Sequence, residues 1–430
     1  MTQIPAWALI PFILQLLMIA VAPLAFEHWW ERNRNKLIVS VILSIPVCIF
    51  MLTKGMTHNL EHQILFDYIP FIILLCALFV VTGGIHLGGD IAAKPATNLA
   101  FLGVGYLLAS LMGTTGAAML LIRPLLRTNQ QRKYRVHTVL FFIALVANCG
   151  GLLTPLGDPP LFLLYLRGAE FSWFFHLFPE WLITGAILLT IYYFLDNYYF
   201  KHEKWEAISA DIREKVPIHI NGKVNFLLLL GIVASVAFIN PQYIPQMADH
   251  HAAFPIKFLR EILLLLLIGA SILLTPKTVR KRNKFTWTPI GEVAFVFLGI
   301  FVTMTPALLY LNQHASEMGL TSPWQFYYAT GLLSGFLDNA PTALAFHSVA
   351  QGLPVSDAVV AGISEALLKA ISVASVFFGA MTYIGNGPNF MVKAIAEENG
   401  VRMPGFFGYI LKFSLIILLP VYILVQLICL

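Results

Sequence analysis

Apolar segments long enough to cross a lipid bilayer recur along the whole chain, and short polar connections separate them. A helix needs about 20 mostly apolar residues to span the hydrocarbon core of a membrane. Only 11% of the 430 residues are charged and 58% are hydrophobic, which excludes an ordinary water-soluble protein. The chain is therefore predicted to be an all-α polytopic membrane protein. The segments lie at 5–26, 37–53, 67–86, 96–122, 136–165, 179–199, 224–242, 257–275, 287–311, 323–350, 358–392 and 405–430.

Two of these segments, 96–122 and 323–350, are interrupted by glycine and polar residues. Each is either a slightly broken span or a re-entrant hairpin that enters and leaves the membrane on one side. Inside connections of membrane proteins are rich in lysine and arginine. The basic residues of this chain gather on one side only when both segments are hairpins. The rule therefore favours about ten crossings, two re-entrant hairpins and two broken helices, with both termini outside.

The two halves of the chain carry matching motifs in opposite predicted orientations. The run 110–116 aligns with 334–340, and the run 151–162 aligns with 379–390. Inverted repeats with Gly- and Pro-broken helices at matching places indicate a secondary transporter with its site near the membrane midplane. The predicted organisation is N-terminal spans at 1–66, repeat 1 at 67–199 with its hairpin at 96–122 and broken helix at 136–165, a central connection and spans at 200–286, and repeat 2 at 287–430 with its hairpin at 323–350 and broken helix at 358–392.

Asp338 and Asn339 lie at the tip of the second hairpin, shortly before Thr342. A carboxylate inside the membrane must be paired, protonated or bound to an ion. The oxygen atoms of these three residues suit a hard cation such as sodium, and a proton on Asp338 would compete with that cation. Asp338 can also cap the helix that follows it, a role that is compatible with ion binding.

The breaks in the two long segments offer further polar groups. Thr154 and Asp158 lie in the first break, where Asp158 is either an intramembrane carboxylate or a helix cap near the outside. Asn386 and Asn389 in the second break supply neutral oxygens and amides. Helix N-termini at such breaks also attract anions, so the breaks leave the sign of the substrate open.

Lys369 follows Glu365 by one helical turn, and an internal pair at this spacing is often structural. It is alternatively a titrating counter-charge for Asp158, Asp338 or Glu292. Glu292 itself lies near the inner start of its span, where an interfacial role is favoured.

Two runs in the second half carry a family resemblance. Ser334-Gly-Phe-Leu-Asp-Asn-Ala-Pro-Thr342 and Gly379-Ala-Met-Thr-Tyr-Ile-Gly-Asn-Gly-Pro-Asn389 resemble the signatures of NhaD-type sodium/proton antiporters. That family belongs to the ion transporter superfamily, with the arsenite permeases, citrate transporters and divalent-anion/sodium symporters. The resemblance covers about residues 67–425. It implies binding where the hairpin tips meet the helix breaks, and a homodimer that works by an elevator motion.

The resemblance also implies which residues bind. The cation site would comprise Asp338, Asn339, Thr342, Thr382, Asn386 and Asn389, and its first-half counterpart would comprise Thr114, Thr115, Asn148, Thr154 and Asp158. Dicarboxylate/sodium members of the superfamily resemble one another in a Ser-Asn-Thr type tip on both hairpins. This chain instead carries Gly113-Thr-Thr-Gly116 on the first hairpin. The departure weakens the case for two sodium sites around a carboxylate substrate and favours cation exchange.

We therefore expect a sodium (or lithium)/proton antiporter of the bacterial inner membrane, with sodium at Asp338 and Asn339. The alternative is ion-coupled transport of a small anion such as citrate, a dicarboxylate or arsenite. The run His58-Asn-Leu-Glu-His62 matches a zinc-peptidase pattern, but a lone match in a short connection does not predict an enzyme. No cofactor and no nucleic-acid partner are expected. The predicted partners are the lipid bilayer, small inorganic ions and a second copy of the chain.

Overall fold

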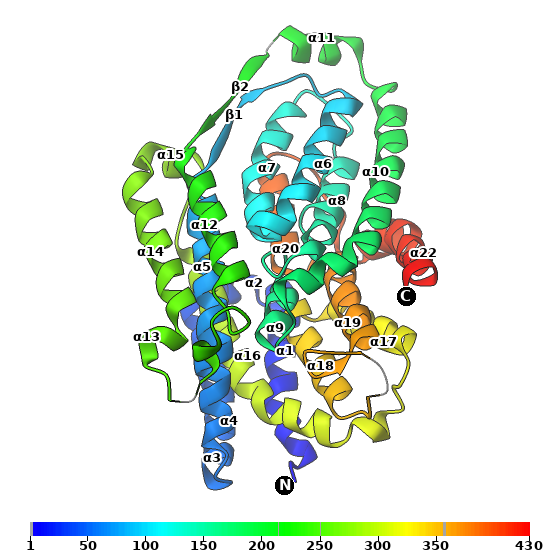
Figure 1. Ribbon diagram of the computed structural model, residues 1–430. Helices are drawn as coiled ribbons and strands as arrows, with labels where there is room; N and C mark the ends of the chain where they lie inside the picture. Colours follow the sequence, from blue (N-terminus) through cyan, green and yellow to red (C-terminus); the bar gives the residue numbers. More distant parts are fainter. Residues whose placement is uncertain (1–2, 214, 250, 356–357) are drawn as a thin grey trace.

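The computed structural model describes residues 3–213, 215–249, 251–355 and 358–430 as an assembly of helices with two small strand pairs (Figure 1). The helices are α1 (Ile10–Ala25), α2 (Glu27–Trp30), α3 (Asn33–Thr53), α4 (Thr57–His62), α5 (Ile69–Thr82), α6 (Pro95–Met112), α7 (Thr114–Thr128), α8 (Val136–Leu145), α9 (Pro159–Leu166), α10 (Phe178–Phe200), α11 (Trp205–Arg213), α12 (Val224–Phe238), α13 (Phe254–Lys257), α14 (Leu259–Leu274), α15 (Lys277–Arg282), α16 (Thr288–Gln313), α17 (Pro323–Phe336), α18 (Asn339–Gln351), α19 (Glu365–Phe378), α20 (Gly387–Glu398), α21 (Phe406–Tyr409) and α22 (Leu419–Cys429). The strands are β1 (His86–Asp90), β2 (Val216–Asn221), β3 (Val359–Val360) and β4 (Ile363–Ser364). The predicted all-α polytopic membrane fold is confirmed.

Eight helical stretches in the described part of the chain are long and apolar enough to span a membrane. One of them is α6, which is an arm of a hairpin rather than a crossing. Two expected crossings fall below this length because α12 has 15 residues and α14 has 16. A third expected crossing is divided into α19 and α20 by the break at 379–386. Length alone therefore identifies fewer spans than charge and pattern together.

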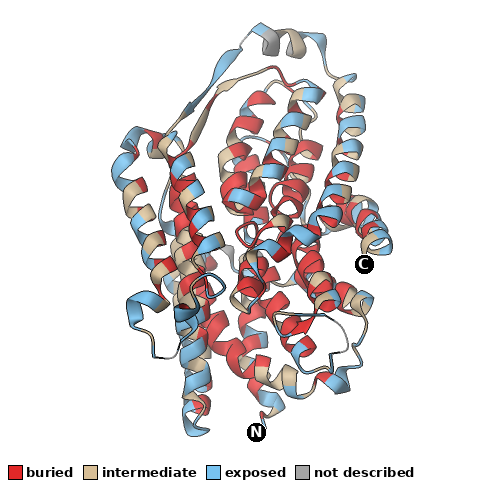
Figure 2. Cartoon of the chain, viewed as in Figure 1, coloured by how far each residue is buried: buried red, intermediate tan, exposed pale blue. Residues whose placement is uncertain are grey.

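The helices form two groups that lie side by side (Figure 1). One group contains α1, α3, α5, α12, α14 and α16, which pack on one another. The other contains α6–α10, α17–α20 and α22. Contacts of α5 with α7 and α9, and of α16 with α18, join the groups. Buried residues are densest in the second group and along its border with the first (Figure 2).

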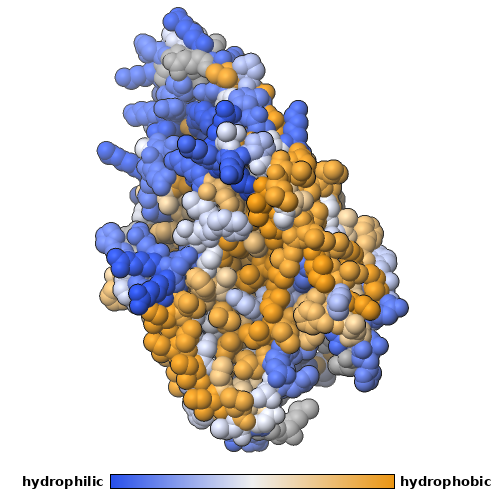
Figure 3. Space-filling view, turned by 90° about the vertical axis from the view of Figure 1, so that its left-hand side faces the viewer, coloured by the Kyte–Doolittle hydropathy of each residue, from blue (hydrophilic) through white to orange (hydrophobic). Residues whose placement is uncertain are grey.

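An antiparallel strand pair connects the groups at one end of the molecule, where His86 lies opposite Asn221. The basic helix α15 and the polar helix α11 lie at this same end (Figure 1). The surface there is hydrophilic, and a broad apolar belt lies below it (Figure 3). This distribution is what a protein embedded in a bilayer requires, since lipid covers the belt and water covers the end.

Candidate functional site

Two hairpin tips and two helix breaks meet in the interior of the molecule. The first hairpin, α6 and α7, turns at Gly113, whose φ of 79° is open to glycine at little steric cost. The second hairpin, α17 and α18, turns through Leu337 and Asp338. The breaks separate α8 from α9 and α19 from α20, each with a short 3₁₀ turn at Cys149–Leu153 or Gly379–Met381.

A threonine organises each break in the same way. The Thr154 hydroxyl donates to the carbonyl of Ser110 and accepts from the amide of Leu156 at 3.2 Å. The Thr382 hydroxyl donates to the carbonyl of Gly335 at 2.6 Å and accepts from the amide of Ile384 at 3.1 Å. Each threonine thus satisfies backbone groups that the broken helix frees, and ties its break to the adjacent hairpin.

These equivalent bonds correct the alignment of the hairpins. Thr154 and Thr382 correspond to each other, as the alignment of the breaks predicts, and each donates to a carbonyl of its adjacent hairpin. The carbonyl partners are Ser110 and Gly335, whereas the sequence alignment matched Ser110 with Ser334. The predicted hairpin alignment is therefore wrong by one position. In the corrected register Thr114 corresponds to Asn339, and each is the first residue of the second hairpin helix.

Asp158 lies at the centre of the site, at the start of α9, and is only 1% exposed. Its Oδ1 accepts from the Thr114 hydroxyl at 2.7 Å and from Asn386 Nδ2 at 3.0 Å. Its Oδ2 accepts from Asn339 Nδ2 at 2.5 Å. Both hairpin tips and both breaks therefore converge on one carboxylate. Among the described residues no basic side chain lies within 4.0 Å of it.

Three asparagines link the two breaks beside this carboxylate. Asn148 Nδ2 donates to Asn389 Oδ1 at 2.7 Å, and Asn386 Nδ2 donates to Asn148 Oδ1 at 3.1 Å. Asn389 Nδ2 donates to the carbonyls of Gly379 and Thr382 at 2.8 and 2.9 Å. The network fixes the position of both breaks, since each amide is buried and hydrogen-bonded within it.

One acceptor in this cluster has no partner. Asn339 is fully buried, and while its Nδ2 binds Asp158, its Oδ1 accepts no hydrogen bond from the described residues. A buried acceptor left unpaired costs about 1–3 kcal/mol. The unpaired oxygen and the carboxylate that lacks a counterion are both suited to a bound cation.

A cavity of about 80 Å³ reaches Asp158 from the border between the helix groups. Thr114, Thr115 and Asp158 line it from one group, and Leu78 of α5 and Val293 of α16 line it from the other. The predicted residue Thr115 therefore faces this cavity and makes no hydrogen bond to the carboxylate among the described contacts.

Asp338 has a different setting from Asp158. Its Oδ1 accepts from the amide of Ala340 at 3.1 Å and so caps α18, and the Thr342 hydroxyl donates to its carbonyl at 2.8 Å. Its side chain is half-buried and makes no hydrogen bond to the carboxylate cluster among the described residues. The capping role proposed for Asp338 is present, and the structure places Asn339 rather than Asp338 against Asp158.

None of the three candidate counter-charges forms an ion pair with Asp158 or Asp338 in the described part of the chain. Lys369 forms its ion pair with Glu180 at 2.5 Å and also donates to the carbonyl of Cys429 at 3.1 Å. Its partner is therefore neither Glu365 nor any carboxylate suggested for it from the sequence. Glu365 accepts from Trp173 Nε1 at 2.8 Å. Glu292 pairs with Lys36 at 2.7 Å, which fits its expected place near the start of its span.

Sequence reasoning missed two buried charged clusters. Glu180 is fully buried in the first turn of α10, within a segment interpreted as a simple apolar span. In the second cluster, the Asp196 carboxylate accepts from Arg132 Nη1 at 3.1 Å, forms an ion pair with Arg132 Nη2 at 2.7 Å and contacts His137 Nε2 at 2.8 Å. The sequence did contain a signal for both clusters, because Glu180 and Asp196 are the acidic residues of the otherwise apolar segment 179–199.

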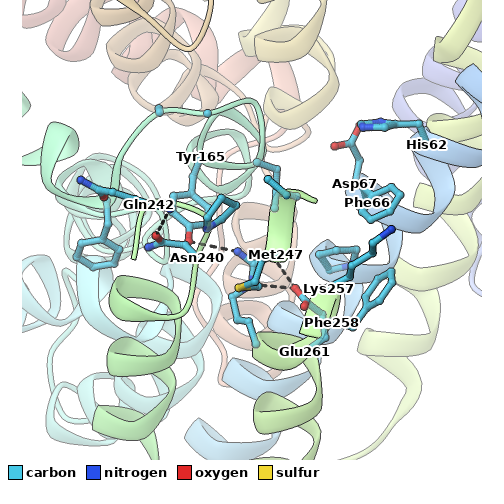
Figure 4. Close-up of a pocket in the computed structure, with 18 of the residues that line it drawn as sticks. His62, Phe66, Asp67, Tyr165, Asn240, Gln242, Met247, Lys257, Phe258 and Glu261 are labelled. Atoms are coloured by element: carbon cyan, nitrogen blue, oxygen red, sulfur yellow. Dashed lines mark hydrogen bonds and ion pairs between the residues drawn. The ribbon is translucent and has the colours of Figure 1, made fainter. Parts of the chain in front are cut away.

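A larger cavity of about 460 Å³ is lined by residues from the start of α5, the end of α9 and the start of α14. His62 and Asp67 point toward one another on one wall, and Tyr165, Asn240 and Gln242 line the other (Figure 4). In the described part of the chain no group of three or more His, Cys, Asp or Glu is placed to hold a metal ion.

The architecture defines the class of the protein, a polytopic membrane protein whose broken helices and hairpins enclose a polar centre, as in secondary transporters. The chain belongs to the family described as "Putative citrate transport" (CitMHS_2), whose model matches residues 1–430. This match places it in the ion transporter superfamily, in a family of transporters. The narrower NhaD-type assignment stays a prediction from the motifs. No curated protein is significantly similar to the chain.

Proposed function

We propose that the protein exchanges a small monovalent cation, sodium or lithium, for protons across the membrane. The observation that carries this proposal is the setting of Asp158, a buried carboxylate held by three neutral side chains and no basic one. A carboxylate in such a place needs a proton or a cation as its counter-charge. Exchange follows because the two compete for the same oxygen atoms.

The donor set around Asp158 suits a hard cation. The Asp158 carboxylate, the Thr114 hydroxyl and the unpaired Asn339 Oδ1 are oxygen ligands from three separate elements. When a cation binds, the Thr114 hydroxyl can present its lone pairs to the ion, and the amides of Asn339 and Asn386 keep the carboxylate oriented. When the cation leaves, a proton taken up from the cavity neutralises the carboxylate. Asp338 precedes Asn339 at the second hairpin tip, where it caps α18 and stays outside the set of groups that hold the Asp158 carboxylate.

A second candidate is ion-coupled transport of a small carboxylate such as citrate. The family description favours it, and so does the convergence of four helix N-termini, those of α7, α9, α18 and α20. Helix N-termini attract anions. Two of these N-termini already carry protein carboxylates, Asp158 on α9 and Asp338 on α18. Because protein carboxylates already lie at these two N-termini, cation exchange is favoured over transport of an anion.

We also propose that the protein lies in a bacterial inner membrane as a homodimer. Its α11 and α15 end would face the cytoplasm because basic residues concentrate in that part of the chain. Both termini would then face the periplasm. Labelling of single cysteines at each end from outside the cell tests this orientation.

The experiment for the function uses proteoliposomes that hold an imposed pH gradient, read by a pH-sensitive dye. Sodium, lithium, potassium, citrate, succinate and arsenite are added in turn. Collapse of the gradient by sodium or lithium alone is the expected result. Flux with citrate or another anion alone would replace cation exchange by the second candidate, and protein-free vesicles control for leak.

A further inference from the structure

A third cavity, which Asp158 does not line, lies where α4 and the C-terminal half of α16 meet the C-terminal ends of α9 and α18. Its volume is about 350 Å³. Among the described residues its wall contains no aspartate or glutamate. The wall is formed by His58, Asn59, His62, Gln63, Arg167, Thr305, Leu308, Leu309, Asn312, Ser348 and Gln351.

A local distortion of a helix builds one wall of this cavity. Between α4 and α5 the chain forms a π-helix, Gln63–Tyr68, in place of a regular α-helix. Such wide turns are rare and often occur at functional sites. Here Gln63 and Asp67 both become buried, at 5% and 2% exposure, and both accept from Arg167 Nη2, at 3.1 and 2.8 Å.

These bonds leave hydrogen-bond donors unused. Gln63 Nε2 is buried and has no partner among the described residues, although its Oε1 is bonded. Nε and Nη1 of Arg167 donate to none of the described residues, while Nη2 is fixed by two acceptors. A guanidinium held in one orientation with free donors is prearranged to bind an oxyanion. The unpaired buried amide donor needs the same kind of partner.

The remaining wall is compatible with such a ligand. His58 and His62 are four residues apart on α4 and so lie on one face of the helix. Asn312, Ser348 and Gln351 add neutral groups from α16 and α18. Asp67 offsets the charge of Arg167 but does not line this cavity.

We propose that this cavity binds a small oxyanion, a carboxylate or a phosphate, between the two helix groups. The site is separate from Asp158 and goes beyond the proposed function. A ligand there would touch Gln63, His58 and His62 on one side and Arg167 on the other. The chemistry is shared by a free anion and by the headgroup of an anionic lipid.

Binding of inorganic phosphate and of citrate to the purified full-length protein, measured by titration calorimetry in an uncharged detergent, tests the site. We expect Gln63→Leu to weaken binding about tenfold, because it removes one unpaired donor. Gln63→Glu, which places an acid in the wall, should abolish binding. Gln351→Glu repeats the test from the opposite, exposed wall, so that a folding defect at Gln63 does not decide the result. Asp158→Asn should leave the affinity unchanged.

Equal affinity of the wild-type protein and both glutamate variants would overturn the proposal, as would the absence of any binding heat. Loss of binding in Asp158→Asn would also overturn it, since the anion would then occupy the central site. Failure of cation exchange leaves these results unaffected, because they do not depend on transport. Repeating the titration in nanodiscs of phosphatidylcholine or phosphatidylglycerol shows whether the natural ligand is a free anion or a lipid headgroup. Competition by phosphatidylglycerol indicates a headgroup, and unchanged binding indicates a free anion.

Discussion

Asp158 and Asn386 occupy equivalent positions in the two halves of the chain and hydrogen-bond to each other at 3.0 Å. Each is the residue immediately before the helix that follows its break. The pseudo-symmetry of the fold therefore brings one carboxylate and one amide to the same point. The amide supplies a donor in place of a second charge, so a single carboxylate remains to be neutralised by a proton or a cation.

Asp158→Asn should abolish transport while leaving folded protein in the membrane, because asparagine has nearly the same shape and removes the charge that exchange requires. Initial rates of cation-driven proton flux in proteoliposomes measure this. Asp338→Asn is the matched control. Asparagine is as good an N-cap as aspartate, so α18 should persist and transport should be reduced but measurable. Wild-type rates in Asp158→Asn would refute the central role of this carboxylate.

Thr114→Val should weaken cation binding about tenfold or more. It removes a hydroxyl that donates to Asp158 Oδ1 at 2.7 Å, and a hydrogen bond to a charged group contributes about 1.5–3 kcal/mol. Thr114→Ser keeps the hydroxyl and should stay close to wild type. The two variants are compared by measuring the KM of each for sodium or lithium. Equal KM values would show that the hydroxyl takes no part in cation binding.

Gly157→Ala should destabilise the protein strongly, because a Cβ at this position would overlap the backbone of Gly151 across the first break. Overpacking of this kind costs about 1–3 kcal/mol or more. Gly103→Ala is the control, since a Cβ there meets nothing within 4 Å and alanine favours the helix. Thermal unfolding in detergent should give a clearly lower melting temperature for Gly157→Ala than for Gly103→Ala. A Gly157→Ala variant as stable as Gly103→Ala would contradict the close packing of the break.

Lys369→Ala should lower stability by about 3–5 kcal/mol, because it leaves the fully buried Glu180 without its partner. The double variant Lys369→Met with Glu180→Gln removes both charges and should recover most of that loss. Melting temperatures of the single and double variants measure the coupling. If the single variant melts like wild type, the ion pair contributes no stability and Lys369 is free for another role.

The layout of the fold could be predicted from the sequence because its signals are local. Apolar length identifies the spans, and the distribution of Lys and Arg distinguishes hairpins from crossings. Gly113 and the paired Thr154 and Thr382 mark where the backbone leaves the helix. The hairpin alignment was wrong by one position because the match rested on a few small residues. Only the hydrogen bonds to Ser110 and Gly335 fix that register.

The candidate site was predicted as a set of residues but not as an arrangement. The sequence favoured Asp338 because it lies at a hairpin tip, whereas the contacts of the structure centre on Asp158. Which carboxylate faces the interior depends on the orientation of a tip, and that orientation is set by packing between segments distant in sequence. The pairing of Lys369 with Glu180 could not be predicted for the same reason, since the two residues lie in different halves of the chain.

The most direct test of the account is the number of protons released when sodium or lithium binds to the purified protein. Calorimetric titration in two buffers with different enthalpies of ionisation measures this number. If one Asp158 carboxylate holds either ion, wild-type protein should release up to one proton for each cation bound, and Asp158→Asn should release none. Cation binding without proton release, or the same release from Asp158→Asn, would contradict exchange at this carboxylate.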